Sequence, residues 1–192
     1  MTGNWKVNVS TKFPQPIATA LSEMNDTLIG ANYTPIAYLG EQVVNGTNHA
    51  VLAEQTILTG KDTKNIVLLI FNVKPTQVGG ATLVSIERIV EGNNALGGTE
   101  VWVDMVLDDD DMAIWDEAFE GFVGSNVAPL AAVGCQMANG MNYLYLATIT
   151  PVAPEAETRV VLVTINAMLK KVSIADILNN KQQTSLGYAF TW

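Results

Sequence analysis

The sequence predicts an α+β protein built from two tandem units, with boundaries near residues 1–93 and 94–192. Three observations lead to this prediction. The chain matches itself when it is shifted by 94 residues, each half contains one stretch with helical periodicity, and each half has an Asn-Gly pair between two strand-like segments. We therefore expect each unit to contain one helix packed on a curved antiparallel sheet of four to five strands.

The internal match is strongest over residues 17–53, where 12 of 37 positions are identical to residues 111–147. Chance would give roughly two identities at average residue usage. Residues 84–86 align with residues 172–174 at an offset of 88, so the second unit is expected to be six residues shorter between its last two strands. Length changes of this kind belong in loops.

In the first unit, residues 5–10 alternate apolar and polar side chains and predict a strand. Pro16 suits the first turn of a helix, residues 16–29 have apolar side chains at helical spacing, and Gly30 is placed to end the helix. Four strands are expected to follow at residues 35–44, 47–58, 66–73 and 82–90, with a turn at 60–62 and a loop at 74–80. Asn45-Gly46 predicts a hairpin, because both central residues of a type I′ turn need positive φ.

The second unit repeats this order. We expect a strand at residues 98–106, a helix that includes residues 114–122, hairpin strands at 130–138 and 141–152 around Asn139-Gly140, and final strands at 159–168 and 171–178. The acidic run at residues 108–111 precedes the helix, where carboxylates cap free N–H groups and face the positive end of the helix dipole. Residues 185–192 could add one further strand.

Composition disfavours several classes of partner. The net charge is −9, which repels nucleic acid and anionic lipid surfaces. The chain has no apolar run of the ~18–20 residues that a membrane helix needs. Cys135 is the single cysteine, and the N-terminus lacks a basic start followed by an apolar run. Both observations fit a reducing compartment, so we expect a cytoplasmic protein without a signal peptide.

The sequence does not predict an enzyme. His49 is the only histidine, and the aligned residue in the second unit is Tyr143, so this site is expected to be an ordinary strand position. One histidine and one cysteine cannot form a zinc site or a convincing nucleophile with its base. We therefore expect no catalytic residues, no metal and no cofactor.

The heptapeptide Gln42-Val43-Val44-Asn45-Gly46-Thr47-Asn48, which follows the expected helix, resembles the Gln-x-Val-x-Gly hairpin of the cystatin family. The resemblance covers residues 3–90 and, through the repeat, about 97–180. It implies a wedge, formed by an N-terminal glycine and the first hairpin, that blocks papain-like cysteine proteases. The residues it implies are Gly3, Gln42, Val43, Val44, Asn45 and Gly46.

The second unit fits the family pattern less well. Its equivalents of the hairpin residues are Gln136, Asn139 and Gly140, but Ala138 replaces the valine before the turn. Its N-terminal glycines are joined to the first unit and give no free arm, and neither final hairpin contains a tryptophan. The resemblance therefore implies an intracellular protease inhibitor acting mainly through the first unit, whose partner is a papain-like protease or another protein.

Two alternatives stay open. The Asn-Gly pairs also serve plain turn chemistry, and the chain could be a structural or assembly module that has the fold without inhibitory activity. The oligomeric state is open as well.

Overall fold

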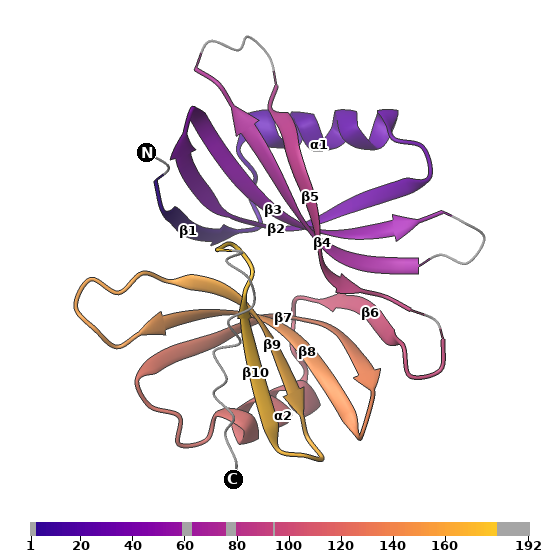
Figure 1. The fold of residues 1–192 in the computed structure, drawn as a ribbon, viewed down its shortest axis with the longest axis vertical. Coiled ribbons are helices and arrows are strands. Elements are labelled where there is room, and N and C mark those ends of the chain that lie inside the picture. Colours follow the sequence, from indigo (N-terminus) through magenta and orange to yellow (C-terminus); the bar gives the residue numbers. More distant parts are fainter. Residues whose placement is uncertain (1–2, 59–62, 76–79, 94, 180–192) are drawn as a thin grey trace. The chain divides into compact units, whose positions relative to one another are not determined.

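The computed structural model describes residues 3–58, 63–75, 80–93 and 95–179 (Figure 1). The chain divides into two compact units, Met1–Gly92 and Asn93–Trp192. The predicted α+β class is confirmed, since the described residues form two helices and two antiparallel five-stranded sheets. The expected turn at residues 60–62, much of the expected loop at 74–80 and the expected strand at 185–192 lie outside the described residues.

Unit 1 contains β1 (Trp5–Ser10), α1 (Gln15–Thr27), β2 (Ala31–Val44), β3 (Gly46–Ile57), β4 (Thr63–Val73) and β5 (Thr82–Glu91). Its strands pair in chain order, β1-β2-β3-β4-β5. Unit 2 contains β6 (Thr99–Asp104), α2 (Asp109–Phe119), β7 (Ser125–Met137), β8 (Met141–Pro151), β9 (Arg159–Asn166) and β10 (Lys171–Asp176). Its strands also pair with their neighbours in the chain, so the two units have the same order of elements.

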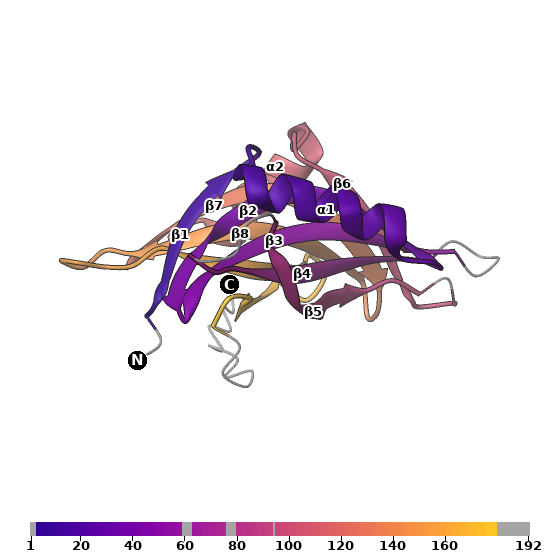
Figure 2. The same cartoon turned by 90° about the horizontal axis from the view of Figure 1, so that it is seen from above.

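Helix α1 is amphipathic, as its periodicity predicts. Ile17, Ala20, Leu21 and Met24 are its buried residues, and they share one hydrophobic cluster with strand residues such as Val51 and Leu69. Figure 2 shows the helix lying along the strands of its own unit. The predicted end at residue 29 is wrong, because Leu28 is already extended and its N–H bonds to the carbonyl of Met24. Gly30, with φ +93°, therefore lies in the connection to β2.

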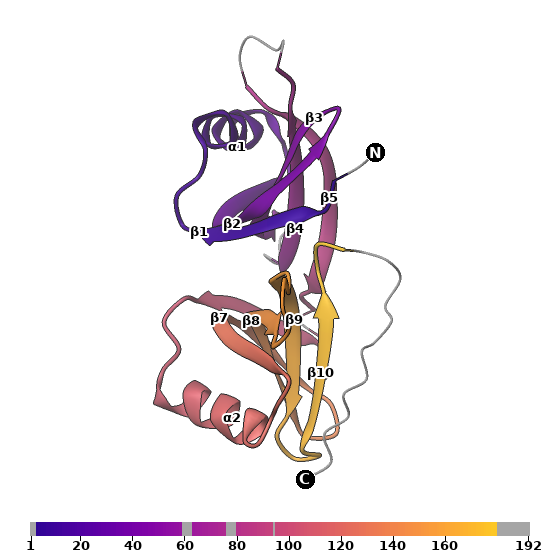
Figure 3. The same ribbon diagram turned by 90° about the vertical axis from the view of Figure 1, so that its left-hand side faces the viewer.

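Helix α2 begins at an acidic cap, which confirms the capping prediction for residues 108–111. Asp108 is the N-cap, and its Oδ1 accepts from the backbone N–H of Asp111 at 2.8 Å. The carboxylate of Asp111 in turn accepts from the hydroxyl of Tyr145 at 2.9 Å. Burial and this hydrogen bond raise the pKa of Tyr145. Trp115, which is buried on the same helix, packs edge-on against the Tyr145 ring, and Figure 3 shows α2 beside the strands of unit 2.

Strands β2 and β7 both begin earlier than predicted, because each tolerates a proline inside the strand. Ala31 to Thr34 already pair with β3, and a register shift follows Pro35. A second shift lies between Tyr38 and Gly40. Proline has no N–H to donate, so a bulge is one of the few places where a sheet accepts it. Unit 2 has the same two shifts, after Pro129 and before Gly134.

Gly40 and Gly134 are needed where β2 and β7 approach their first neighbours. Their φ values are +149° and +150°. A Cβ at Gly40 would collide with the backbone carbonyl of Lys6, and one at Gly134 would collide with that of Glu100. Only glycine allows the first strand of each sheet to lie so close at this bulge.

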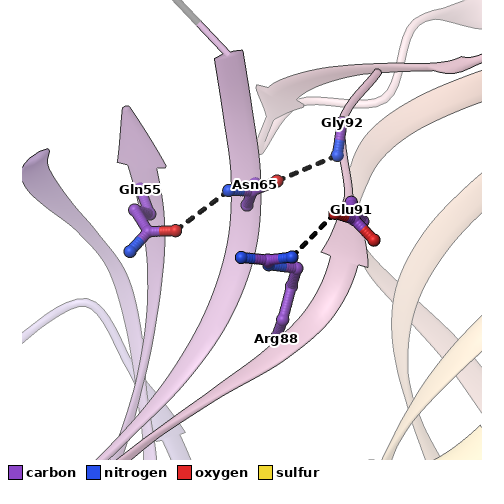
Figure 4. A network of polar contacts seen from close by, with 5 residues as sticks. All are labelled: Gln55, Asn65, Arg88, Glu91 and Gly92. Carbon is purple, nitrogen blue, oxygen red and sulfur yellow. Dashed lines mark hydrogen bonds and ion pairs between the residues drawn. The ribbon is translucent and has the colours of Figure 1, made fainter. Parts of the chain in front are cut away.

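A chain of polar contacts runs from helix α1 to Gly92, which follows β5, and Figure 4 shows the part of it that joins Gln55, Asn65 and Gly92. The Asn25 side chain exchanges two hydrogen bonds with the backbone of Tyr33, and the Tyr33 hydroxyl accepts from Gln55 at 2.8 Å. Asn65 then donates to Gln55 at 2.9 Å and accepts from the Gly92 N–H at 3.0 Å. Because Asn65 is only 1% exposed, both ends of its amide need these partners.

Replacing Asn65 with leucine should destabilise unit 1 by about 1–3 kcal/mol, because the Gly92 N–H and the Gln55 oxygen would lose their partner at a buried site. The control is Arg88→Ala, which removes the ion pair between Arg88 and Glu91. The two side chains are 47% and 69% exposed, respectively. In that variant the free energy of unfolding should fall by less than about 1 kcal/mol. Urea unfolding measures both losses, and equal losses would contradict a special role for Asn65.

Candidate functional site

The candidate site is the tip where β2 turns into β3. Val44 pairs with Gly46 and Val43 with Thr47, so Asn45 alone lies beyond the paired residues. The predicted type I′ turn is wrong for this hairpin. Gly46 has a φ of +99°, whereas Asn45 is not among the residues with positive φ. A two-residue turn would also have placed Val44 opposite Thr47, which is a different register.

The structure brings Gly3 against this tip. The Gly3 N–H donates to the carbonyl of Val43 at 2.9 Å, and the Gln42 side-chain amide donates to the carbonyl of Gly3 at 3.0 Å. A Cβ at Gly3 would lie 3.2 Å from the Val43 oxygen, so a side chain there would be tight. Three of the residues that the resemblance implies, Gly3, Gln42 and Val43, are therefore joined by hydrogen bonds.

Two asparagines that sequence reasoning did not assign to the site extend this network. Asn48 on β3 donates to the Gln42 Oε1 at 3.2 Å, and Asn72 on β4 donates to the Asn48 Oδ1 at 2.8 Å. The pairs Gln42–Asn48 and Asn48–Asn72 are directly opposite each other in the sheet. A signal was present in the sequence, because the 94-residue shift places asparagines at both equivalent positions, 142 and 166.

The tip of unit 2 has a related arrangement. The Gln136 side chain donates to the carbonyl of Gly97 at 3.3 Å, and Asn166 donates to Asn142 at 2.6 Å. Asn139 and Gly140, at the turn, have φ values of +47° and +101°. The residues predicted as the weaker site, Gln136, Asn139 and Gly140, thus lie at one tip. The pairing register is the same as in unit 1, because Gln136 lies opposite Asn142.

The end of the first tip is uncharged and exposes one large apolar side chain, that of Val43. Val43 is 65% exposed, Asn45 is exposed, and Val44 is half-buried. In unit 2 the equivalent of Val43 is Met137, which is 66% exposed. Such a surface can make contacts in an apolar cleft without removing a charge from water.

His49 lies near the tip but has a structural partner. Its Nδ1 is 2.9 Å from the hydroxyl of Tyr38. Burial lowers the pKa of His49, an effect that Glu41 partly opposes, and burial together with Glu41 raises the pKa of Tyr38 to about 12. The pair therefore stays neutral near pH 7, as expected for a buried tyrosine beside a half-buried histidine on the neighbouring strand.

Cys135 is half-buried on β7, opposite Glu100 of β6. Burial, and then the charge of Glu100, raises the pKa of its thiol. Since the thiolate is the reactive form, this environment weakens Cys135 as a nucleophile. Among the described residues, no group of three or more histidine, cysteine, aspartate or glutamate side chains could hold a metal ion. Neither described helix is long and apolar enough to span a bilayer.

Comparison of the chain with family models, with curated proteins and with solved structures finds no match. The first tip presents Gly3 hydrogen-bonded to the hairpin and an exposed Val43 side chain.

The lowered pKa of His49 gives a testable pH dependence. Unfolded His49 binds a proton below its ordinary value of about 6.5, whereas the folded protein resists protonation until lower pH. This contribution to stability should therefore be complete above pH 6.5 and decline as the pH falls below it. Urea unfolding at pH 7.5 and pH 5 should show a smaller pH-dependent loss for His49→Gln than for the unchanged protein. Equal losses in the two proteins would contradict this assignment.

Proposed function

We propose that the chain is a non-catalytic binding protein of the cystatin type, acting as an inhibitor of papain-like cysteine proteases through the first tip. The finer fold assignment, two tandem cystatin-like units each with one helix on a curved sheet, belongs to the same proposal. Its support is the hairpin sequence at residues 42–48 and the common order of elements in the two units.

One observation carries the functional proposal. Gly3 and the first hairpin are joined by two hydrogen bonds, from the Gly3 N–H to Val43 and from Gln42 to the Gly3 carbonyl. An N-terminal segment and a hairpin that act as one wedge need such a connection. The exposed Val43 side chain then stands at the end of this joined edge.

The physical basis of inhibition is occlusion without chemistry. A preformed hairpin loses little conformational entropy when it enters a cleft, and its uncharged end avoids the desolvation of a charge. A wedge that lies beside the catalytic thiol, without presenting a scissile bond to it, blocks substrate and is not cleaved.

A second candidate function is a structural or assembly module without inhibitory activity. The observation that favours it is the internal use of Gln42, whose amide nitrogen and oxygen are both engaged within the unit. The same connection to an N-terminal glycine exists in unit 2, where Gly97 follows unit 1 and is not near a chain end. Because the glutamine–glycine hydrogen bond occurs in both units, it can be explained by a contribution to folding without any role in binding.

Titration against papain separates the two candidates. An inhibitor should reduce papain activity at micromolar protein, and the absence of any inhibition at that concentration would exclude the inhibitor function for this protease class. Gly46 is a poor site for a test variant, because a Cβ there would lie 2.6 Å from the Val73 carbonyl and would disturb the fold.

Val43→Arg is the sharper variant, because Val43 is 65% exposed and its replacement leaves the core unchanged. Entry of the tip into an apolar cleft would now desolvate a charge, so the inhibition constant should rise about tenfold or more, which corresponds to about 1.4 kcal/mol. The matched control is Met137→Arg, at the equivalent, 66% exposed position of unit 2. The proposal for the first tip fails when Met137→Arg weakens inhibition and Val43→Arg does not.

A further inference from the structure

The three side-chain amides at the first tip form a chain in which each one donates to the next. Asn72 donates to Asn48, Asn48 donates to Gln42, and Gln42 donates to the carbonyl of Gly3, at 2.8, 3.2 and 3.0 Å. An amide offers a donor at one end and an acceptor at the other. The Gly3 carbonyl can only accept, so it takes the Gln42 nitrogen, and the Gln42 oxygen is left to accept from Asn48.

This amide chain begins on the third strand of the tip region, where a Cβ at Gly46 would lie 3.0 Å from the Asn72 Oδ1. Asn72 lies on β4, two strands away from the β2 residues that turn at the tip, and both Asn48 and Asn72 are half-buried. Their side chains lie on the face of the sheet opposite α1, because the alternate residues Val51, Leu69 and Phe71 belong to the cluster that includes the helix. These asparagines therefore point away from Val43, which follows Gln42 on β2 and faces the other side of the sheet.

We propose that Asn48 and Asn72 are positioning residues for the wedge, and that Gln42 acts through Gly3 and does not contact the protease. This inference rests on the proposed function. The amide chain fixes the N-terminal segment against the hairpin before a partner arrives, so that binding does not have to order it. A segment that is ordered in advance lowers the entropic cost of association.

The test is a double-mutant cycle on the full chain with papain as the probe. Asn48→Leu keeps a similar side-chain volume and removes both hydrogen bonds, and it should raise the inhibition constant about fivefold, as expected for the loss of about 1 kcal/mol. Deletion of residues 1–3 should weaken inhibition by itself. When Asn48→Leu is made in the deleted chain, no further loss is expected, because Asn48 acts through the missing segment.

Additive losses in the two variants would overturn the inference, since Asn48 would then act independently of the N-terminal segment. Asn142→Leu is the matched control, because it changes the equivalent residue of unit 2 and should leave inhibition through the first tip unchanged. A fivefold loss in Asn142→Leu would also overturn it.

A second measurement separates this inference from the proposed function. Hydrogen exchange of the Gly3 amide, which donates to Val43, can be followed by NMR without any protease. Asn48→Leu should accelerate this exchange several-fold while the exchange of core amides such as that of Leu69, which is fully buried, stays unchanged. If papain is not inhibited, the proposed function fails while the exchange experiment still decides the coupling. An unchanged Gly3 exchange rate overturns the coupling whatever the papain result.

Discussion

The pairing register of β2 with β3 is the constraint on which the candidate site depends. With Val43 opposite Thr47, Gln42 lies opposite Asn48, and Asn48 lies opposite Asn72 on the next strand. In the two-residue turn that the Asn-Gly pair predicts, Gln42 would have been opposite His49. Because a one-residue slip moves side chains to the other face of a sheet, that register could not have formed the amide chain to Gly3.

Unit 1 contains these two networks of side-chain hydrogen bonds, and they have different physical effects. The chain from Asn25 to Gly92 passes through the buried Asn65, where an unpaired amide would cost about 1–3 kcal/mol, so it has a clear role in stability. The chain from Asn72 to Gly3 lies at the half-buried tip, where each hydrogen bond adds only about 0.5–1.5 kcal/mol. Its main physical effect is on geometry, because it attaches the start of the chain to the hairpin.

The elements of this fold were largely predictable, whereas the register was not. The helical periodicity of residues 16–29 and the β-branched run at 66–73 reflect local patterns. Strand β4 contains the whole of the second run, and α1 contains the first run up to Thr27. The bulges at Pro35 and Gly40 depend on contacts with other strands of the sheet. The sequence therefore indicates them only by the presence of a proline and a glycine within a strand. For the candidate site, the hairpin residues were found by their resemblance. Asn48 and Asn72 recur at positions 142 and 166 of the repeat, but their connection to Gln42 could not be predicted before the register was known, because it exists only between cross-strand neighbours.

The two tips share a strand register and a Gln–Gly contact, although Asn139 has a positive φ that Asn45 lacks, and they lie on units of different charge. Unit 1 carries six basic and seven acidic residues, whereas unit 2 carries four basic and twelve acidic residues. Long-range charge steers association and changes its rate with ionic strength, while the apolar contact at a tip depends little on salt. Unit 1 is nearly neutral and exposes a valine at its tip, whereas unit 2 is acidic and exposes a methionine at the equivalent position. Repetition of the Gln–Gly connection in both units is evidence for a common way of building the tip, because the contact forms in a nearly neutral unit and in an acidic one.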